Sequence, residues 1–174
     1  VFNKVLNTTD RTYNKYYPRG KDFFNIGVNY QFFWKRFTFL GETALDKQGR
    51  IATMNMLRYS PKGSFQLVVM NRFYDVAYQS MYANSIGEGS SVQNESGFYI
   101  GLETNILRYF KLNAYGDFFY FPWKKYQVSK NGTHGFDGVF QLSFSPRYEL
   151  DMFIRYRYKN KYKDFTPEEG EKIT

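Results

Sequence analysis

The chain has 174 residues, a length that fits one domain, and its 24 Lys and Arg against 16 Asp and Glu give a net charge of +8. It has no Cys and a single His, at position 134, which excludes a disulfide scaffold, a thiolate metal site and a multi-histidine metal site. Aromatic residues make up 22% of the chain, and such residues favour strands. The longest aliphatic run, residues 67–70, is far shorter than the roughly 20 residues of a membrane-spanning helix.

The first predicted element is a β-strand over residues 22–32, where apolar and polar residues alternate with a period of two. One face carries large apolar side chains, and the other carries Asn, Gly and Gln. Such a strand needs one apolar surface and one wet or polar-packed surface. The apolar face consists of Phe24, Ile26, Val28, Tyr30 and Phe32.

Six further segments show the same alternation with more noise, and they are residues 36–45, 51–59, 64–74, 97–106, 110–121 and 136–145. The last segment, residues 148–159, shows it as clearly as the first. Its apolar face includes Leu150, Met152, Ile154 and Tyr156. Its polar face, interrupted by Phe153, consists of Glu149, Asp151, Arg155, Arg157 and Lys159. No segment has the 3.6-residue period of a helix, so the sequence predicts about eight antiparallel strands.

The predicted connections alternate in length along the chain. Those after the first, third, fifth and seventh strands are tight turns, whereas residues 75–96 and 122–135 form long polar loops and residues 46–50 an intermediate one. Short turns on one side and long loops on the other are typical of outer-membrane barrels, which have periplasmic turns and external loops. We therefore predict an all-β fold, an antiparallel up-and-down transmembrane β-barrel.

Aromatic residues cluster at both ends of the predicted strands, as they do in the two interfacial girdles of a membrane barrel. At the long-loop end, the girdle is predicted to include Phe73, Tyr74, Phe119, Tyr120, Phe121 and Trp123. Between the girdles, the apolar faces of the first and last strands are expected to contact lipid. These lipid-facing residues are Phe24, Ile26, Val28, Tyr30, Phe32, Leu150, Met152, Ile154 and Tyr156.

Residues 1–174 are interpreted as a single barrel segment that is incomplete at both ends. If the long loops face outward, the residues before the first strand and those after the eighth both lie on the external side, where a barrel inserted from the periplasm is not expected to end. Residues 167–174 are moreover polar and offer no closing strand. We therefore expect part of a larger barrel, and the alternative is a closed eight-stranded barrel with disordered ends.

Several sequence blocks together resemble the C-terminal barrel region of outer-membrane proteins of Bacteroidota that contain a helix-hairpin-helix domain. The blocks are residues 18–27, 39–42, 78–84, 97–103, 121–123 and 133–137. The resemblance covers most of the chain and implies location in the bacterial outer membrane. It concerns the barrel region alone, so no activity of the helix-hairpin-helix module, DNA binding included, carries over to this chain.

Charged residues on the polar strand faces are interpreted as lumen-facing. Arg155, Arg157 and Lys159 share the polar face of the last predicted strand. They either tune selectivity for solutes or are neutralised by acidic residues of the same wall, namely Glu103, Glu149 and Asp151. The lumen-facing candidates are therefore Glu103, Glu149, Asp151, Arg155, Arg157 and Lys159.

No catalytic, cofactor-binding or metal-binding residue is predicted, and the protein is not expected to be an enzyme. His134 and Asp137 lie close in sequence beside Gly residues, but no second motif completes a hydrolase site. Residues 87–91 are rich in Gly and Ser but lack the Lys of a phosphate-binding loop, so they are predicted to be a flexible loop tip. The aromatic residues lie apart from the basic ones, which disfavours a nucleic-acid surface.

The pattern favours an outer-membrane β-barrel that acts as a channel or transporter wall, or as a scaffold in an envelope complex. Its partners would be membrane lipids, with other envelope proteins or further strands of the same barrel. The alternative is a soluble, lipocalin-like eight-stranded barrel that turns its apolar faces inward around an apolar ligand. Solubility without detergent would distinguish this alternative from the membrane barrel.

Overall fold

The structure is a computed structural model that describes residues 5–6 and 11–164. Its regular elements are a short 3₁₀ helix, η1 (Thr12–Asn14), and the strands β1 (Asn25–Trp34), β2 (Phe37–Asp46), β3 (Ile51–Lys62), β4 (Phe65–Tyr74), β5 (Glu95–Leu107), β6 (Phe110–Phe121), β7 (Thr133–Arg147) and β8 (Leu150–Lys161). Within the described ranges, no helix is long and apolar enough to cross a membrane. The polar residues 167–174 lie outside the described residues.

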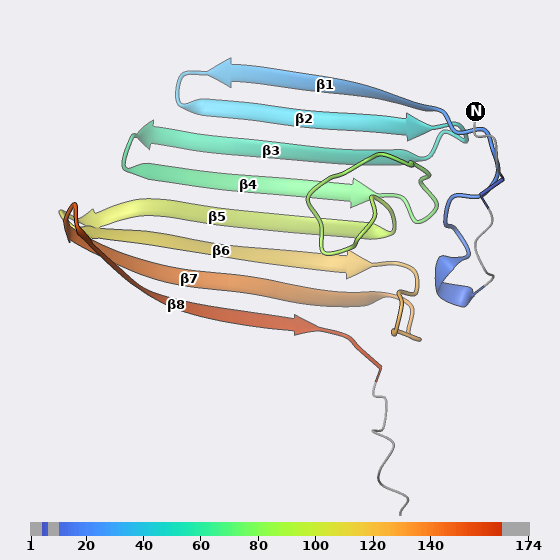
Figure 1. The fold of residues 1–174 in the computed structure, drawn as a ribbon. Helices are drawn as coiled ribbons and strands as arrows, with labels where there is room; N and C mark the ends of the chain where they lie inside the picture. The colour runs from blue at the N-terminus through green and yellow to red at the C-terminus, as the bar shows by residue number, and fades with distance from the viewer. Residues whose placement is uncertain (1–4, 7–10, 165–174) are drawn as a thin grey trace, which may run out of the picture.

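All strands belong to one antiparallel sheet, in which each strand pairs with its neighbours in sequence from β1 to β8 (Figure 1). This confirms the predicted all-β, up-and-down organisation. Every predicted strand is present, and its observed ends differ from the predicted ends by three residues or fewer. The period of two is informative here because the two faces of a pleated strand meet different surroundings.

The connections segregate by length to opposite ends of the sheet (Figure 1). At one end, residues 35–36, 63–64, 108–109 and 148–149 form two-residue turns. At the other end lie residues 47–50, 75–94 and 122–132. The alternation of tight turns and longer loops that the sequence predicts is therefore present, and both long loops lie at the same end of the sheet.

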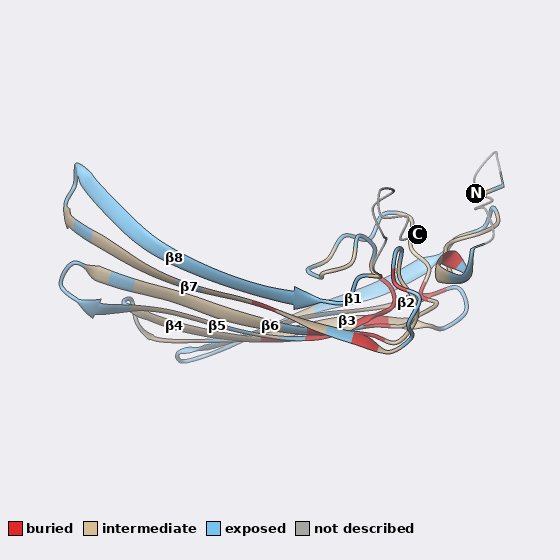
Figure 2. Ribbon diagram, turned by 90° about the horizontal axis from the view of Figure 1, so that it is seen from below, coloured by how far each residue is buried: buried red, intermediate tan, exposed pale blue. Residues whose placement is uncertain are grey.

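The sheet is open, because β1 and β8 form its two edges and are not paired with each other. It is strongly twisted and curls toward the side on which residues 75–94 lie (Figure 2). We call this side of the sheet the concave face and the other side the convex face. Each edge strand therefore has one row of backbone N–H and C=O groups without a strand partner among the described residues.

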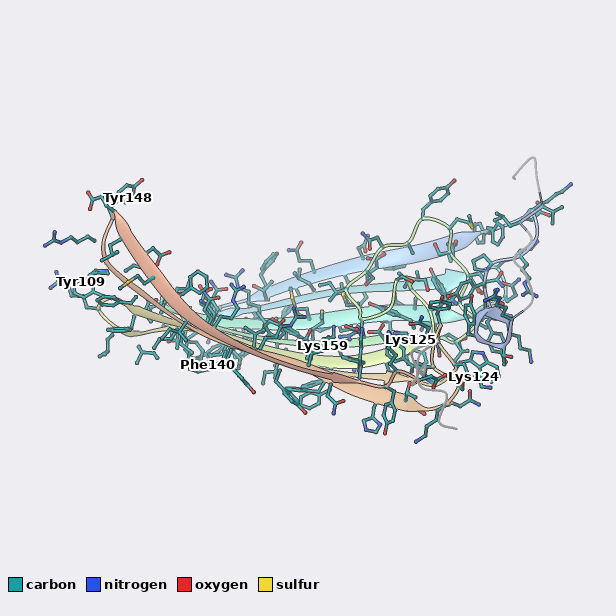
Figure 3. All side chains as sticks on the ribbon, turned by 60° about the horizontal axis from the view of Figure 1, so that its bottom comes forward. Tyr109, Lys124, Lys125, Phe140, Tyr148 and Lys159 are labelled. Carbon is teal, nitrogen blue, oxygen red and sulfur yellow. The ribbon has the colours of Figure 1, made fainter. Side chains whose placement is uncertain are left out.

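Strand register separates polar from apolar side chains. Arg72, Asp117 and Lys159 lie on the concave face, and Figure 3 shows Lys159 on that side and Phe140 projecting from the convex side. The convex face carries exposed large apolar side chains on most strands, including Ile26, Val28, Phe32, Phe98, Ile100, Phe118, Phe140, Met152, Ile154 and Tyr156. The apolar surface of this sheet thus faces away from the loops.

The residues predicted to contact lipid lie on the convex face of β1 and β8, apart from Phe24, which precedes β1. Ile154 is 77% exposed there. Tyr30 is half-buried, because its ring lies over β2, and its hydroxyl donates a hydrogen bond to Asn55 Oδ1 and lies 3.3 Å from Thr43 Oγ1. The polar groups of this region of the convex face therefore bond to one another.

The predicted aromatic girdle at the long-loop end needs a correction. Phe73 and Tyr120 lie on the convex face, as a girdle requires. Tyr74, Phe119 and Phe121 lie instead on the concave face, where they are 3%, 3% and 5% exposed. Consecutive strand residues point to opposite faces, so a cluster of aromatic residues in sequence divides between a surface belt and a packed interior layer.

Candidate functional site

The concave face is built around a buried ion cluster of Arg72, Glu95 and Asp117, which we call the Arg72 cluster. Arg72 Nε donates to Glu95 Oε1 over 2.7 Å, while Nη1 and Nη2 donate to the two carboxylate oxygens of Asp117 over 2.7 and 3.1 Å. Arg72 and Glu95 are 0% exposed. A guanidinium has donors arranged in a planar fork, so one Arg can join two carboxylates on different strands.

Gly97 makes room for this arrangement. It lies directly opposite Arg72 in the pairing of β4 with β5, and a Cβ atom at this position would stand 2.2 Å from Arg72 Cζ. Without a side chain at residue 97, the guanidinium lies across β5 and reaches Asp117 on β6. The cluster can therefore form because the large side chain of Arg72 on β4 faces a glycine, Gly97, on the adjacent strand β5.

Glu95 also fastens the loop of residues 75–94 to the sheet. Its carboxylate accepts hydrogen bonds from the backbone N–H groups of Glu88, over 2.9 Å, and Gly89, over 2.7 Å. Residues 88 and 89 of the predicted loop tip, residues 87–91, are therefore hydrogen-bonded to the sheet, and the flexibility of this segment stays a prediction. These residues wrap around a buried carboxylate, because Glu95 offers an ionised acceptor to their backbone donors.

Glu88 holds the same loop to β8 through its side chain. Its two carboxylate oxygens accept from Lys159 Nζ at 2.7 Å and from Lys161 Nζ at 3.2 Å. Burial alone would raise the pKa of Glu88, but the hydrogen bonds and charges of the two lysines outweigh it and hold the pKa below its usual value. The loop between β4 and β5 is therefore tied to the far edge of the sheet.

Part of residues 75–94 packs onto the concave face, while other loop residues, such as Tyr82 and Ile86, are exposed. The Tyr74 hydroxyl lies 2.6 Å from Ser85 Oγ and donates to the carbonyl oxygen of Ile86 over 2.8 Å. Tyr78 is 2% exposed. The two long loops also meet, since Asn94 Oδ1 accepts from the backbone N–H of Trp123 over 2.7 Å. The loop of residues 75–94 is thus partly packed against the sheet and in contact with the other long loop.

The basic residues predicted to face the lumen do lie together on the concave face of β8, but their partners differ from those predicted. Arg157 Nε donates to Asp137 Oδ1 over 3.0 Å, and Lys159 lies 3.4 Å from the same carboxylate. Arg155 Nε donates to the amide oxygen of Gln141 over 2.7 Å. The carboxylates that neutralise these basic residues are therefore Asp137 of β7 and, for Lys159, also Glu88 of the loop.

The acidic residues predicted to neutralise β8 make other contacts. Glu103 pairs with Lys111 over 2.9 Å, and Asp151 accepts from Ser145 Oγ over 2.7 Å. Glu149 is not part of β8, because it lies in the two-residue turn that reverses the chain after Arg147. The predicted set therefore divides into separate local pairs rather than one cluster.

The structure does not bring His134 and Asp137 together. Three residues apart on β7, they project from opposite faces, and His134 packs edge-to-face against Tyr162 with ring centroids 5.5 Å apart. Asp137 is engaged with Arg157 on the concave face. A catalytic pair of these two residues is therefore not formed in this sheet.

A groove of about 500 Å³ occupies the other half of the concave face, toward the tight turns. Along it runs one cross-strand row of polar side chains, which consists of Gln66, Glu103, Asn113, Gln141 and Arg155. Beside this row, Tyr99 and Tyr115 stack with ring centroids 5.6 Å apart and an interplanar angle of 28°. The concave face thus has a half covered by residues 75–94 and an open, polar half.

The described part of the chain contains no group of three or more His, Asp or Glu side chains arranged to hold a metal ion. No protein-family model, curated protein or solved structure matches this chain.

None of the three residues of the Arg72 cluster is among the charged residues predicted from the sequence to face the lumen. Arg72 lies inside a strand that reads as apolar, and Glu95 opens the next strand after a long loop. A charged residue at an inward-facing strand position is a usable signal, because a buried charge requires a partner. Identifying that partner requires the register between β4 and β5.

Proposed function

We propose that this chain forms part of the wall of a bacterial outer-membrane β-barrel, with the convex face in lipid and the concave face lining the lumen. One observation carries the proposal: most of the exposed large apolar side chains of the strands lie on the convex side, with exceptions such as Phe33 and Phe153, while the hydrogen-bonded charges and a packed loop lie on the concave side. Membrane barrels have this outward apolar and inward polar arrangement.

Hydrogen bonding on the convex face supports the same proposal. In lipid, a polar group must find its partner within the protein. Tyr30 bonds to Asn55, and Thr43 Oγ1 lies 2.8 Å from Thr53 Oγ1. The strands have 10 to 15 residues, enough for the 9–11 that a tilted strand needs to cross a bilayer.

A lipocalin-like barrel requires the opposite arrangement, with apolar side chains on the concave side around the ligand. Here the concave face carries the Arg72 cluster, the Asp137 pairs and the polar row of the groove. These observations favour the membrane barrel over the soluble alternative.

The free edges of β1 and β8 lead to the second part of the proposal. Unpaired backbone groups in lipid cost several kcal/mol each, so an open edge is not tolerated there. We therefore propose that further strands, of this protein or of another chain, pair with β1 and β8 and continue the wall. The tight turns would face the periplasm and the long loops the exterior.

Within such a barrel, residues 75–94 would occupy part of the lumen at the external end. This placement suits a channel or transporter wall whose opening is narrowed by its own loop, and it also suits a scaffold. The groove on the other half of the concave face favours passage or binding of a solute.

Site-directed fluorescence tests this orientation directly, because the chain has no native cysteine. Phe140→Cys and Val139→Cys place a label on adjacent residues of β7 that project from opposite faces. The protein is inserted in vesicles, labelled with an environment-sensitive dye, and exposed in turn to a lipid-phase quencher and an aqueous quencher.

We expect the label at residue 140 to be quenched from the lipid phase and the label at residue 139 from water. The pair Ile154→Cys and Arg155→Cys on β8 is a second, matched test. The opposite result at both pairs would assign the apolar face to an interior and support the soluble barrel. Aqueous quenching at all four positions would show that no face of the sheet contacts lipid.

A further inference from the structure

We propose that the groove on the concave face is a saccharide-binding site, with Tyr99 and Tyr115 as its stacking platform. This inference deepens the proposed function, on which it rests, because it assigns the class of solute that the lumen would accept. The groove of about 500 Å³ lies within the usual range of ligand sites, which is roughly 300–1,000 Å³.

Two aromatic rings, those of Tyr99 and Tyr115, lie side by side in the groove. Tyr99 leans over Gly101, where a Cβ atom would stand 2.7 Å from the Tyr99 hydroxyl oxygen. The ring thus covers bare backbone on the floor of the groove, and Tyr115 stacks beside it. Two rings side by side offer an extended apolar surface, and the C–H faces of pyranose rings pack against such surfaces.

A row of polar side chains runs beside these rings. Gln66, Glu103, Asn113, Gln141 and Arg155 stand opposite one another on five consecutive strands. Four steps between strands of about 4.8 Å give a row about 19 Å long, enough for several sugar units. Amide, carboxylate and guanidinium groups supply paired donors and acceptors, which suit the adjacent hydroxyl groups of a sugar.

Most charged side chains of the groove are paired within the protein. Glu103 is paired with Lys111, and Arg157 with Asp137, so neither presents a free charge to the groove. Arg155 Nε donates to the neutral amide of Gln141, and the guanidinium carbon lies 5.3 Å from the centroid of the Phe153 ring. A groove with a single uncompensated cation fits polyhydroxylated ligands that are neutral or carry an isolated carboxylate, rather than polyanions.

A glycan array that contains neutral chains and uronic-acid chains tests the inference. The labelled protein is applied in a sugar-free detergent, and Kd values for bound glycans are measured by calorimetry. We expect at least one class to bind, and Tyr99→Ala and Tyr115→Ala each to weaken binding roughly tenfold or more. Tyr158→Ala, which removes a tyrosine from the convex face, is the matched control and should leave Kd unchanged.

Arg155→Gln separates the two glycan classes. It should weaken the binding of acidic chains more than that of neutral chains, because Gln keeps hydrogen-bonding groups for sugar hydroxyls but loses the charge that a carboxylate needs. Val139→Trp, on the floor of the groove, provides a variant that blocks the site without removing either tyrosine, in case the Ala variants do not fold.

Two results would overturn the inference: no glycan bound by folded protein, or binding that survives Val139→Trp and both Tyr→Ala changes. Its failure is distinguishable from failure of the proposed function. Lipid quenching at residue 140 without glycan binding would refute the saccharide site alone. Glycan binding with only aqueous quenching at residue 140 would refute the membrane wall and leave the site standing.

Discussion

Lys159 on β8 and Glu88 in the loop between β4 and β5 are joined by a 2.7 Å hydrogen bond between Nζ and Oε2. The buried carboxylate of Glu95 also holds this loop, by accepting hydrogen bonds from the backbone N–H groups of Glu88 and Gly89. Two charged contacts therefore help to keep residues 75–94 on the concave face, one at the Arg72 cluster and one at the far edge strand.

Glu88→Gln should loosen the loop at its β8 contact while the contact at Glu95 remains. Charged hydrogen bonds contribute about 1.5–3 kcal/mol in ordinary cases, so we expect faster local opening without loss of the fold. Hydrogen exchange of residues 85–93 measures this opening. Glu149→Gln, in an exposed turn, is the control and should change nothing; equal protection in both variants would show that Glu88 does not hold the loop.

The same contact should depend on pH. The pKa of Glu88 is lowered in the folded loop, so its stabilising contribution is complete above the usual value of 4.5 and is lost as pH falls through the lowered pKa. A spin label at Ser90→Cys should therefore become more mobile on acidification below about pH 4.5. The Glu88→Gln background should remove this dependence, and a pH response that persists in it would assign the effect to another group.

Arg72→Met should be among the most destabilising single changes in the sheet. It leaves the buried carboxylate of Glu95 and the partly buried carboxylate of Asp117 without their cation, and breaking a buried pair in this way costs about 3–5 kcal/mol. Denaturant unfolding measures the loss. The triple variant with Glu95→Gln and Asp117→Asn should recover part of it, and no recovery would show that side-chain volume, rather than charge, dominates.

Gly97→Ala should disrupt the same cluster without altering any charge. The added methyl group would stand 2.2 Å from Arg72 Cζ, and the guanidinium cannot move away without breaking its bonds to Glu95 and Asp117. Gly27→Ala is the matched control, because the nearest atom to its Cβ is 3.6 Å away. We expect a drop in unfolding free energy for Gly97→Ala alone, and similar stabilities of the two variants would contradict this account.

Ile154→Arg and Arg155→Ile exchange the character of two adjacent residues on opposite faces of β8. If the convex face lies in lipid, Ile154→Arg should cost about 2–4 kcal/mol near the bilayer midplane, and Arg155→Ile should still insert. Folding yield into vesicles gives the comparison. Normal insertion of Ile154→Arg together with failure of Arg155→Ile would reverse the orientation.

The strands and turns could be predicted because both depend on local sequence. The two-residue turns at 35–36 and 63–64 fix the register of their hairpins and so assign each side chain to a face. The Arg72 cluster could not be predicted in this way. Arg72 and Glu95 are separated by the loop of residues 75–94, and a long connection leaves the register of β4 against β5 undetermined.

The contacts of the loop of residues 75–94 could not be predicted from the sequence for a related reason. Residues 87–91 look like a flexible segment because Gly and Ser bury little apolar surface. Their hydrogen-bond partners are the carboxylate of Glu95 and the ammonium groups of Lys159 and Lys161. Residues 87–91 are distant in the sequence from β8, so a local sequence pattern does not predict the contacts.

The bond between Glu88 and Lys159 also sets an order of events during folding. Strands β5 to β8 must be synthesised and aligned before Lys159 can contact Glu88, since the two residues are 71 positions apart in the sequence. Contacts between distant residues form late because their loop-closure entropy must first be offset. The final fastening of residues 75–94 thus reports that the last strand has docked in its correct register.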